Sequence, residues 1–190
     1  IAGYSKKAKD EDTGNNEREE IIDCKNYGGI ICNYSEYVGG IVGKTDMPVS
    51  ESENNGRVKS EYDYVGGIAG IAKVELTDCK NSEEVIGNSY VGGIVGQSET
   101  NVSECSNLSN VTGKKNNIGG IIGYAKGPVG NCENSGNVNG SSENTGGIVG
   151  YALDYVNDCN NTGRVEGYAK NMGGIVGYAE SSVSICTNSG

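Results

Sequence analysis

Short apolar pairs framed by glycine recur along the whole chain and set its pattern of hydrophobic and polar positions. The clearest copy is Val-Gly-Gly-Ile-Val-Gly, from Val38 to Gly43. Equivalent segments begin at Val65, Val91, Ile118, Thr145 and Met172, so that successive copies lie 26 or 27 residues apart. A period this regular is typical of a solenoid, in which each repeat is one supersecondary unit stacked on the next.

Three β-branched positions in each period predict three short strands per coil. In one repeat, the first strand carries Val129 and Cys132, the second a lone Val138, and the third the segment Gly146 to Gly150. Glycine beside β-branched residues favours short strands with tight corners over helix. We therefore expect an all-β fold: a single-stranded parallel β-helix of about seven coils of 27 residues. The crossover rule favours a right-handed coil.

Residues 1–190 are predicted to form one β-solenoid domain that is a fragment of a longer array. The segment Ile1 to Ser5 aligns with Ile148 to Ala152, and Cys186 to Gly190 aligns with Cys132 to Gly136, so both ends fall inside a repeat. Solenoids need capping repeats for solubility, and neither end has one.

The stretch from Lys6 to Glu20 is an insertion relative to the other repeats, and its polar composition predicts a solvent loop. Within it, Asp10 to Gly14 has a faint likeness to a calcium loop. It lacks the third oxygen ligand before the glycine that an EF-hand requires. We therefore predict no metal site, with calcium binding by this loop left open.

Composition narrows the function classes. The chain has a net charge of −10, which opposes contact with nucleic acid and anionic lipid. No apolar run approaches the roughly 20 residues of a membrane helix. Histidine, the commonest general base, is absent. Arg57 and Arg164 lie four repeats apart, so these basic residues cannot meet in one catalytic site. We expect no enzyme, no cofactor, no nucleic-acid partner and no membrane insertion.

Two columns of identical residues predict ladders inside the rod. Asparagine occupies one position in every coil (Asn26, Asn54, Asn81, Asn107, Asn134, Asn161, Asn188). Stacked at equivalent turns, these amides are expected to bond to one another, although a ligand-binding row is the alternative. Cysteine occupies a second column, interrupted by Ser52. Residues one coil apart point the same way, which suits buried free thiols better than disulfides.

The third strand leaves an ambiguity about its outer face. Strict alternation would place the Ile41 column inside and the Val42 column outside. Together with Val38, Val65 and Val91, the outer column would then form an apolar docking stripe. The alternative is a bend that turns both columns inward, or a neighbouring part of the parent protein that covers the stripe.

Tyr37, Tyr64 and Tyr90 share a position two residues before the glycine pair, where later repeats have asparagine. Three tyrosines at one coil spacing form an aromatic platform that suits sugar rings or peptide. Tyrosine there can also simply cover glycine-rich backbone. These three residues are the predicted ligand-binding site, and no catalytic residue is predicted.

The unit Asn134-Ser135-Gly136-Asn137-Val138, followed by Gly146 to Ala152, resembles the GLUG repeat of large bacterial surface proteins. That repeat also occurs outside the catalytic domain of some IgA-cleaving metallopeptidases. The resemblance covers nearly the whole chain except Lys6 to Glu20. It implies β-helix-like architecture and an extracellular or cell-surface location in a bacterium. The His-Glu-x-x-His protease motif does not carry over, because the chain has no histidine.

From these observations we expect a non-catalytic structural or adhesive module. Its predicted partners are a host glycan, mucin or protein and the rest of the parent array. The alternatives are a polysaccharide lyase-like β-helix and an accessory domain of a large surface protease.

Overall fold

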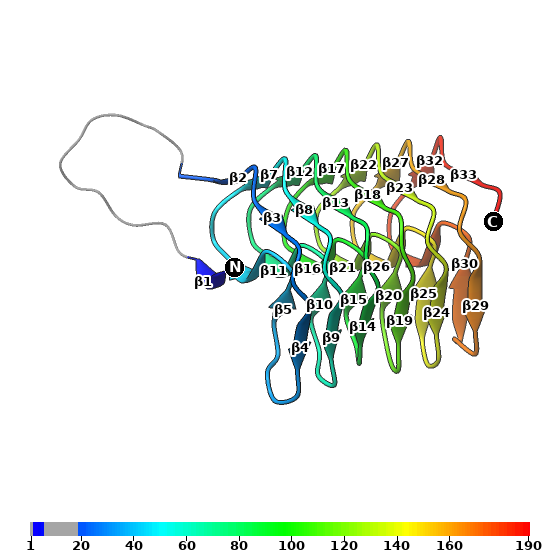
Figure 1. The fold of residues 1–190 in the computed structure, drawn as a ribbon. Coiled ribbons are helices and arrows are strands. Elements are labelled where there is room, and N and C mark those ends of the chain that lie inside the picture. The colour runs from blue at the N-terminus through cyan, green and yellow to red at the C-terminus, as the bar shows by residue number, and fades with distance from the viewer. Residues whose placement is uncertain (1, 6–18) are drawn as a thin grey trace.

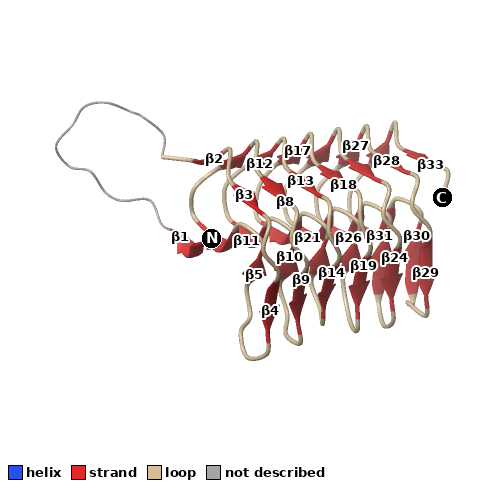
Figure 2. Ribbon diagram, viewed as in Figure 1, coloured by secondary structure: helices blue, strands red, loops and turns tan. Residues whose placement is uncertain are grey.

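The chain folds as a β-solenoid of parallel strands. The computed structural model describes residues 2–5 and 19–190, and every regular element in these ranges is a strand (Figure 2). The chain makes about six turns, and equivalent asparagines in neighbouring turns lie 26 to 28 residues apart. Each strand pairs in parallel with its equivalent one turn away, so the turns stack into a rod (Figure 1). Of the predicted 6–20 loop, only Glu19 and Glu20 fall within the described residues, so Asp10 to Gly14 lies outside them.

Five parallel sheets run along the rod, and we number them in the order in which each turn passes through them. The first sheet holds β2 (Ile21–Ile22), β7 (Val49–Ser50), β12 (Leu76–Thr77), β17 (Val102–Ser103), β22 (Val129–Gly130), β27 (Val156–Asn157) and β32 (Val183–Ser184). The second holds β3 (Lys25–Asn26), β8 (Glu53–Asn54), β13 (Lys80–Asn81), β18 (Ser106–Asn107), β23 (Glu133–Asn134), β28 (Asn160–Asn161) and β33 (Thr187–Asn188).

The third and fourth sheets lie at the bottom of Figure 1. The third sheet holds β4 (Ile30–Cys32), β9 (Val58–Ser60), β14 (Val85–Gly87), β19 (Val111–Gly113), β24 (Val138–Gly140) and β29 (Val165–Gly167). The fourth holds β5 (Val38–Gly39), β10 (Val65–Gly66), β15 (Val91–Gly92), β20 (Ile118–Gly119), β25 (Asn144–Gly146) and β30 (Asn171–Gly173).

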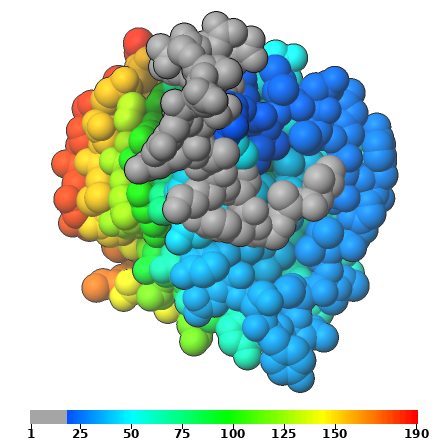
Figure 3. Space-filling view, turned by 90° about the vertical axis from the view of Figure 1, so that its left-hand side faces the viewer, coloured from blue at the N-terminus to red at the C-terminus, as the bar shows by residue number. Residues whose placement is uncertain are grey.

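The fifth sheet closes each turn and leads back to the first. It holds β1 (Ala2–Ser5), β6 (Val42–Thr45), β11 (Ala69–Ala72), β16 (Val95–Ser98), β21 (Ile122–Ala125), β26 (Val149–Ala152) and β31 (Val176–Ala179). Viewed along the rod from the N-terminal end, the first turns lie in front and later turns emerge behind them (Figure 3).

Each turn has five short strands, not the three that the sequence predicts. The first predicted strand divides in two because the residue before the cysteine adopts a left-handed backbone, with φ of 49° at Asp78 and 53° at Asn131. Asp and Asn tolerate this conformation, which turns the chain sharply between the first and second sheets. The third predicted strand divides at its glycine pair.

The glycine pair also settles the ambiguity of the third strand. Ile121 and Ile122 are adjacent in sequence, yet both are fully buried. The chain bends at Gly120 and Ile121, between β20 and β21. The packing there is tight: an added Cβ would lie 2.0 Å from the carbonyl oxygen of Ile122 if placed on Gly119, and 2.1 Å from that of Gly147 if placed on Gly120. Alternation fails across this bend, so both columns face inward. The predicted apolar docking stripe is therefore wrong: Val38, Val65 and Val91 are buried as well.

Two apolar cores fill the rod, with the asparagine column between them. The larger core holds the isoleucine, valine and cysteine columns of the first, second and fifth sheets, and the smaller holds those of the third and fourth. Asn81 lies against Gly67, which connects Val65 of the smaller core to Ile68 of the larger.

The predicted asparagine ladder is confirmed. The Nδ2 group of Asn81 donates to Oδ1 of Asn107 at 2.8 Å, and that of Asn107 donates to Oδ1 of Asn134 at 2.7 Å. From Asn26 to Asn161, each Nδ2 also donates to a backbone carbonyl two residues later, such as Ser109 O at 2.6 Å. Because both amide hydrogens have partners, the buried side chains cost little desolvation free energy.

The cysteine column consists of free thiols. Cys79, Cys105, Cys132 and Cys159 are buried, and all seven cysteines are unpaired. Each thiol donates to a carbonyl two residues earlier, as Cys132 does to Gly130 O at 3.2 Å. Ser52 makes the equivalent bond to Ser50 O at 2.7 Å, so serine replaces cysteine without losing the contact.

Candidate functional site

The three predicted site residues lie side by side on the rod. Tyr37, Tyr64 and Tyr90 precede β5, β10 and β15, and the backbone amide that follows each of the first two bonds to the next tyrosine's carbonyl. The ring centroids of Tyr37 and Tyr64 lie 5.2 Å apart, and those of Tyr64 and Tyr90 lie 4.6 Å apart with an interplanar angle of 6°. The structure thus brings the three together as a stack.

The stack does not end at Tyr90. The ring of Tyr124 meets that of Tyr90 edge to face, with centroids 5.9 Å apart and an interplanar angle of 87°. From there the row continues through Tyr151 and Tyr178, at centroid distances of 5.2 and 4.9 Å. We call these six residues (Tyr37, Tyr64, Tyr90, Tyr124, Tyr151 and Tyr178) the tyrosine row.

Two different positions of the repeat supply the tyrosine row. The first three rings come from the position before the fourth sheet, which we call the early position. The last three come from the fifth sheet, where Tyr124 pairs with Gln97 of the turn before and Tyr151 of the turn after; this is the late position. The sequence analysis missed the late position. Its signal is the Gly-Tyr-Ala triplet at 123–125, 150–152 and 177–179.

The two positions are neighbours because the backbones beneath them approach closely. A Cβ on Gly70, one residue before the late position, would lie 2.7 Å from the carbonyl carbon of Tyr37. The same contact joins Gly150 to Asn117. In the first turn of the row, the late residue Lys44 places its Nζ 5.2 Å from the centroid of the Tyr37 ring. We call the line of close backbone contacts that includes Gly70 and Gly150 the glycine seam, and the tyrosine row lies over it.

The rings present their rims to solvent more than their faces. Tyr64 has a ring on either side, so a sugar cannot stack flat on it as on an open platform. Its partial exposure must come from the ring edge and the hydroxyl group. The end residues are more open, at 38% exposure for Tyr37 and 44% for Tyr178. The row is thus a ridge of aromatic edges and phenol groups, each of which can donate and accept a hydrogen bond.

Two phenols of the row, those of Tyr64 and Tyr151, have raised pKa values. Burial raises the pKa of Tyr64, and the neighbouring Tyr90 and Tyr37 add to the effect. The hydroxyl of Tyr151 donates to Oε1 of Glu180, which raises the pKa of Tyr151 to about 12. At neutral pH Tyr64 and Tyr151 are therefore uncharged phenols.

In addition to the asparagine ladder between the two cores, a second and shorter ladder of amides occupies the early position in the later turns. Asn144 donates to Oδ1 of Asn117, and Asn171 donates to Oδ1 of Asn144, both at 2.7 Å. The early position therefore carries stacked rings in three turns and stacked amides in the next three.

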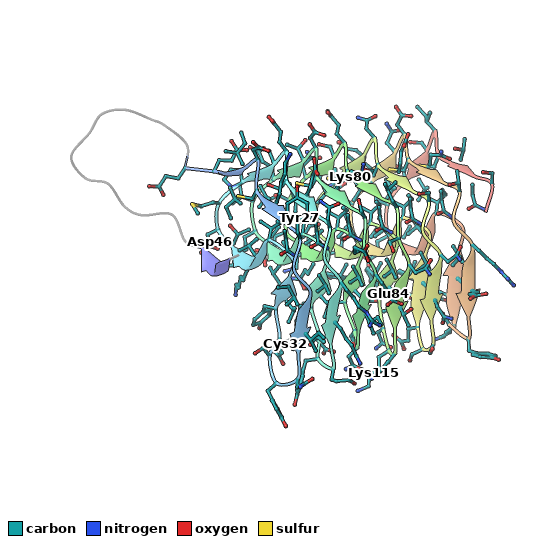
Figure 4. All side chains as sticks on the ribbon, viewed as in Figure 1. Tyr27, Cys32, Asp46, Lys80, Glu84 and Lys115 are labelled. Atoms are coloured by element: carbon teal, nitrogen blue, oxygen red, sulfur yellow. The ribbon has the colours of Figure 1, made fainter. Side chains whose placement is uncertain are left out.

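The charged side chains elsewhere do not gather into a catalytic arrangement. Arg57 lies 2.8 Å from Glu84, and Arg164 lies 3.4 Å from Glu166, four turns further along the rod. Figure 4 shows such side chains in rows along the outside, including Lys80, Glu84 and Lys115. Within residues 2–5 and 19–190, no three His, Cys, Asp or Glu side chains are grouped to hold a metal ion. The same ranges contain no helix that could span a membrane.

Comparisons with known proteins add no relative. No protein-family model, no curated protein and no solved structure matches the chain.

Proposed function

We propose that this chain is a non-catalytic, rod-like repeat module of a bacterial cell-surface or secreted protein, and that it contacts a host glycan, mucin or protein through the tyrosine row. One observation carries the proposal: each turn from Tyr37 to Tyr178 supplies one ring, although the position that supplies it changes midway.

The fold itself needs a tyrosine at neither position. At the early position, Asn117, Asn144 and Asn171 replace tyrosine without interrupting the sheets. At the late position, the turns before Tyr124 carry Lys44, Ile71 and Gln97, which pair in the same register. A turn that lacks tyrosine at one position has it at the other. Each turn of the row thus keeps one ring although the fold does not require it at either position. Contact with a ligand would explain why the ring is kept.

The early position is also unfavourable for tyrosine. From Tyr37 to Asn117 the backbone there is left-handed, with φ of 60° at Tyr64 and 61° at Asn117. Asparagine adopts this conformation readily, whereas other residues pay of order 1–3 kcal/mol for it. Ring stacking offsets part of that free energy, at about 0.5–1.5 kcal/mol per pair. Strained residues of this kind cluster at functional sites.

The shape and surroundings of the row suit a binding surface. Tyrosine offers a large amphipathic contact area with little side-chain entropy to lose, which is why binding surfaces favour it. A solenoid holds such residues in fixed register over many turns. The likeness of the repeat to the GLUG motif supports the bacterial surface setting.

A binding screen with matched variants tests this proposal. Glycan arrays, immobilised mucin and extracellular-matrix proteins are probed with the wild-type chain, the double variant Tyr64→Asn/Tyr90→Asn, and the control Tyr168→Asn. Tyr168 is 92% exposed and lies outside the row. We expect the control to bind as wild type and the row variant to bind at least tenfold more weakly, with unchanged circular dichroism. Equal binding by all three chains would contradict the proposal and mean that the tyrosines only shield the backbone of the glycine seam from solvent.

A further inference from the structure

The tyrosine row differs from a local pocket in being linear and parallel to the rod axis. Its rings succeed one another once per turn, from Tyr37 to Tyr178, with centroids 4.6 to 5.9 Å apart. A ligand that uses the whole row must be a chain with a matching repeat.

We infer that the ligand of the tyrosine row is an uncharged, unbranched polysaccharide that lies along the rod axis with about one sugar unit per turn. This inference rests on the proposed function of the row as a contact surface and names the chemistry of what it contacts.

The spacing favours a sugar chain over a peptide. Stacked strands repeat at about 4.8 Å, whereas an extended peptide advances about 3.3 Å per residue and presents every second side chain to one face. A peptide along the axis would therefore lose register with the rings within a few turns. A pyranose chain linked through its 1 and 4 positions advances by about one ring width per unit, close to the rise of one turn.

The lysines on the fifth-sheet side of the row are paired with acids, and Glu180, the remaining acid of that column, accepts from the hydroxyl of Tyr151. The column that begins with Asp46 continues with Lys73, Glu99, Lys126, Leu153 and Glu180. Lys73 lies 2.9 Å from Asp46, and Lys126 lies 3.5 Å from Glu99. The amine of Lys44 lies over the face of Tyr37. These lysines are already engaged, so they do not form a cationic groove for uronic or sulfated sugars.

On the other side of the row, the charges are also unsuited to an anionic chain. The residues just before the early position are Glu36, Asp63, Ser89, Asn116, Glu143 and Lys170. The Asp63 carboxylate accepts from Asn88 Nδ2 at 2.8 Å and from the Ser89 amide at 3.0 Å, so part of its charge holds the loop. With a net charge of −10 on the chain, an anionic polymer would be repelled.

Apart from Lys44 over Tyr37 and Glu180 beside Tyr151, the groups along the ridge are neutral. They are phenol hydroxyls, ring edges and the amide of Gln97, which pairs in register with Tyr124. Hydroxyl and amide groups both donate and accept hydrogen bonds, as sugar hydroxyls require. Ring edges supply apolar contact to the C–H groups between those hydroxyls.

Isothermal titration with defined oligomers tests the inference. The neutral probes are cellohexaose, chitohexaose and mannohexaose with their trioses, and the charged probes are hexagalacturonate and hexalysine. We expect at least one neutral hexaose to bind at least tenfold more tightly than its triose. That binding should weaken at least tenfold in Tyr64→Asn and in Tyr124→Gln but not in Tyr168→Asn.

The other outcomes separate this inference from the proposed function. Tighter binding of hexagalacturonate or hexalysine that depends on Tyr64 would overturn the neutral sugar chain and keep the contact surface. A neutral hexaose that binds no better than its triose would overturn the axial arrangement. If no oligomer binds while mucin or a protein binds through the row, the sugar chain is wrong and the proposed function stands. If nothing binds through the row, both fail.

Discussion

Asn107 and Asn134 are joined by a side-chain hydrogen bond of 2.7 Å between two turns of the rod, and both are essentially buried. The same Nδ2 of Asn107 also holds the carbonyl of Ser109. One side chain therefore ties together a local turn and two successive turns of the solenoid, at the boundary between the two cores.

Replacing Asn134 by alanine should break this ladder. We expect a loss of about 1–3 kcal/mol in unfolding free energy, because the Asn107 amide and the Gly136 carbonyl lose buried partners. Urea denaturation measures it. Asn139→Ala is the control, since Asn139 lies in β24 outside the ladder and is partly exposed. Equal losses at the two positions would argue against a stabilising ladder.

Gly120→Ala should be more damaging than Gly130→Ala. Its Cβ would lie 2.1 Å from the carbonyl oxygen of Gly147 and 2.4 Å from Cγ of Asn134. Overpacking of this kind costs about 1–3 kcal/mol or more. At Gly130 the nearest atom to a new Cβ is 3.7 Å away, so Gly130→Ala should change stability by less than about 1 kcal/mol. Thermal melts of both variants compare them, and similar melting temperatures would contradict the bend.

Thr145→Val should stabilise the protein. Thr145 is fully buried in the fourth sheet, and its hydroxyl has no hydrogen-bond partner in the described chain. The equivalent residues are Val91 and Ile118 in the two preceding turns. Removing an unsatisfied buried hydroxyl should raise the unfolding free energy by about 1 kcal/mol. A drop in stability in urea denaturation would mean that the hydroxyl has a partner.

The four buried cysteines of the column should behave as reduced and inaccessible. Burial raises the pKa of Cys105 well above its ordinary value, which leaves little reactive thiolate at that position. In folded protein four thiols should react slowly with DTNB, whereas the half-buried Cys24, Cys32 and Cys186 react faster, and unfolded, unreduced protein should release seven equivalents. Cys132→Ala should cost about 1 kcal/mol, the effect of a methyl-sized void. A count below seven would show disulfides, whose loss costs roughly 2–5 kcal/mol.

The repeat made the stacked columns predictable, but not the path of the backbone between them. Asn134 and Cys132 each recur at one fixed position, so their ladders follow from the period alone. The inward turn of both Ile121 and Ile122 does not, because alternation holds only within an unbroken strand and fails at the bend of Gly120 and Ile121. This break adds one of the two extra strands per turn, and the left-handed residue before the cysteine adds the other.

Only the half of the candidate site at the early position could be predicted from the sequence. Tyr37, Tyr64 and Tyr90 share one column and stand out in the sequence. Tyr124 belongs to a different column, and its contact with Tyr90 depends on how closely the fourth and fifth sheets approach at the glycine seam. Taken together, the two columns show one tyrosine per turn, a pattern that neither column shows alone.

Moving one ring between the two positions tests the central claim most directly. The variant Tyr64→Asn removes the ring of its turn. The double variant Tyr64→Asn/Ile71→Tyr restores a ring to that turn at the late position. The wild-type turn with Asn144 and Tyr151 has this same arrangement, with asparagine at the early position and tyrosine at the late position. The measurement is the dissociation constant for the glycan or protein bound most tightly in the binding screen. The account predicts weaker binding by the single variant and recovery to within about threefold of wild type by the double variant. A double variant that binds as weakly as the single one would contradict the claim that the row of rings is the contact surface.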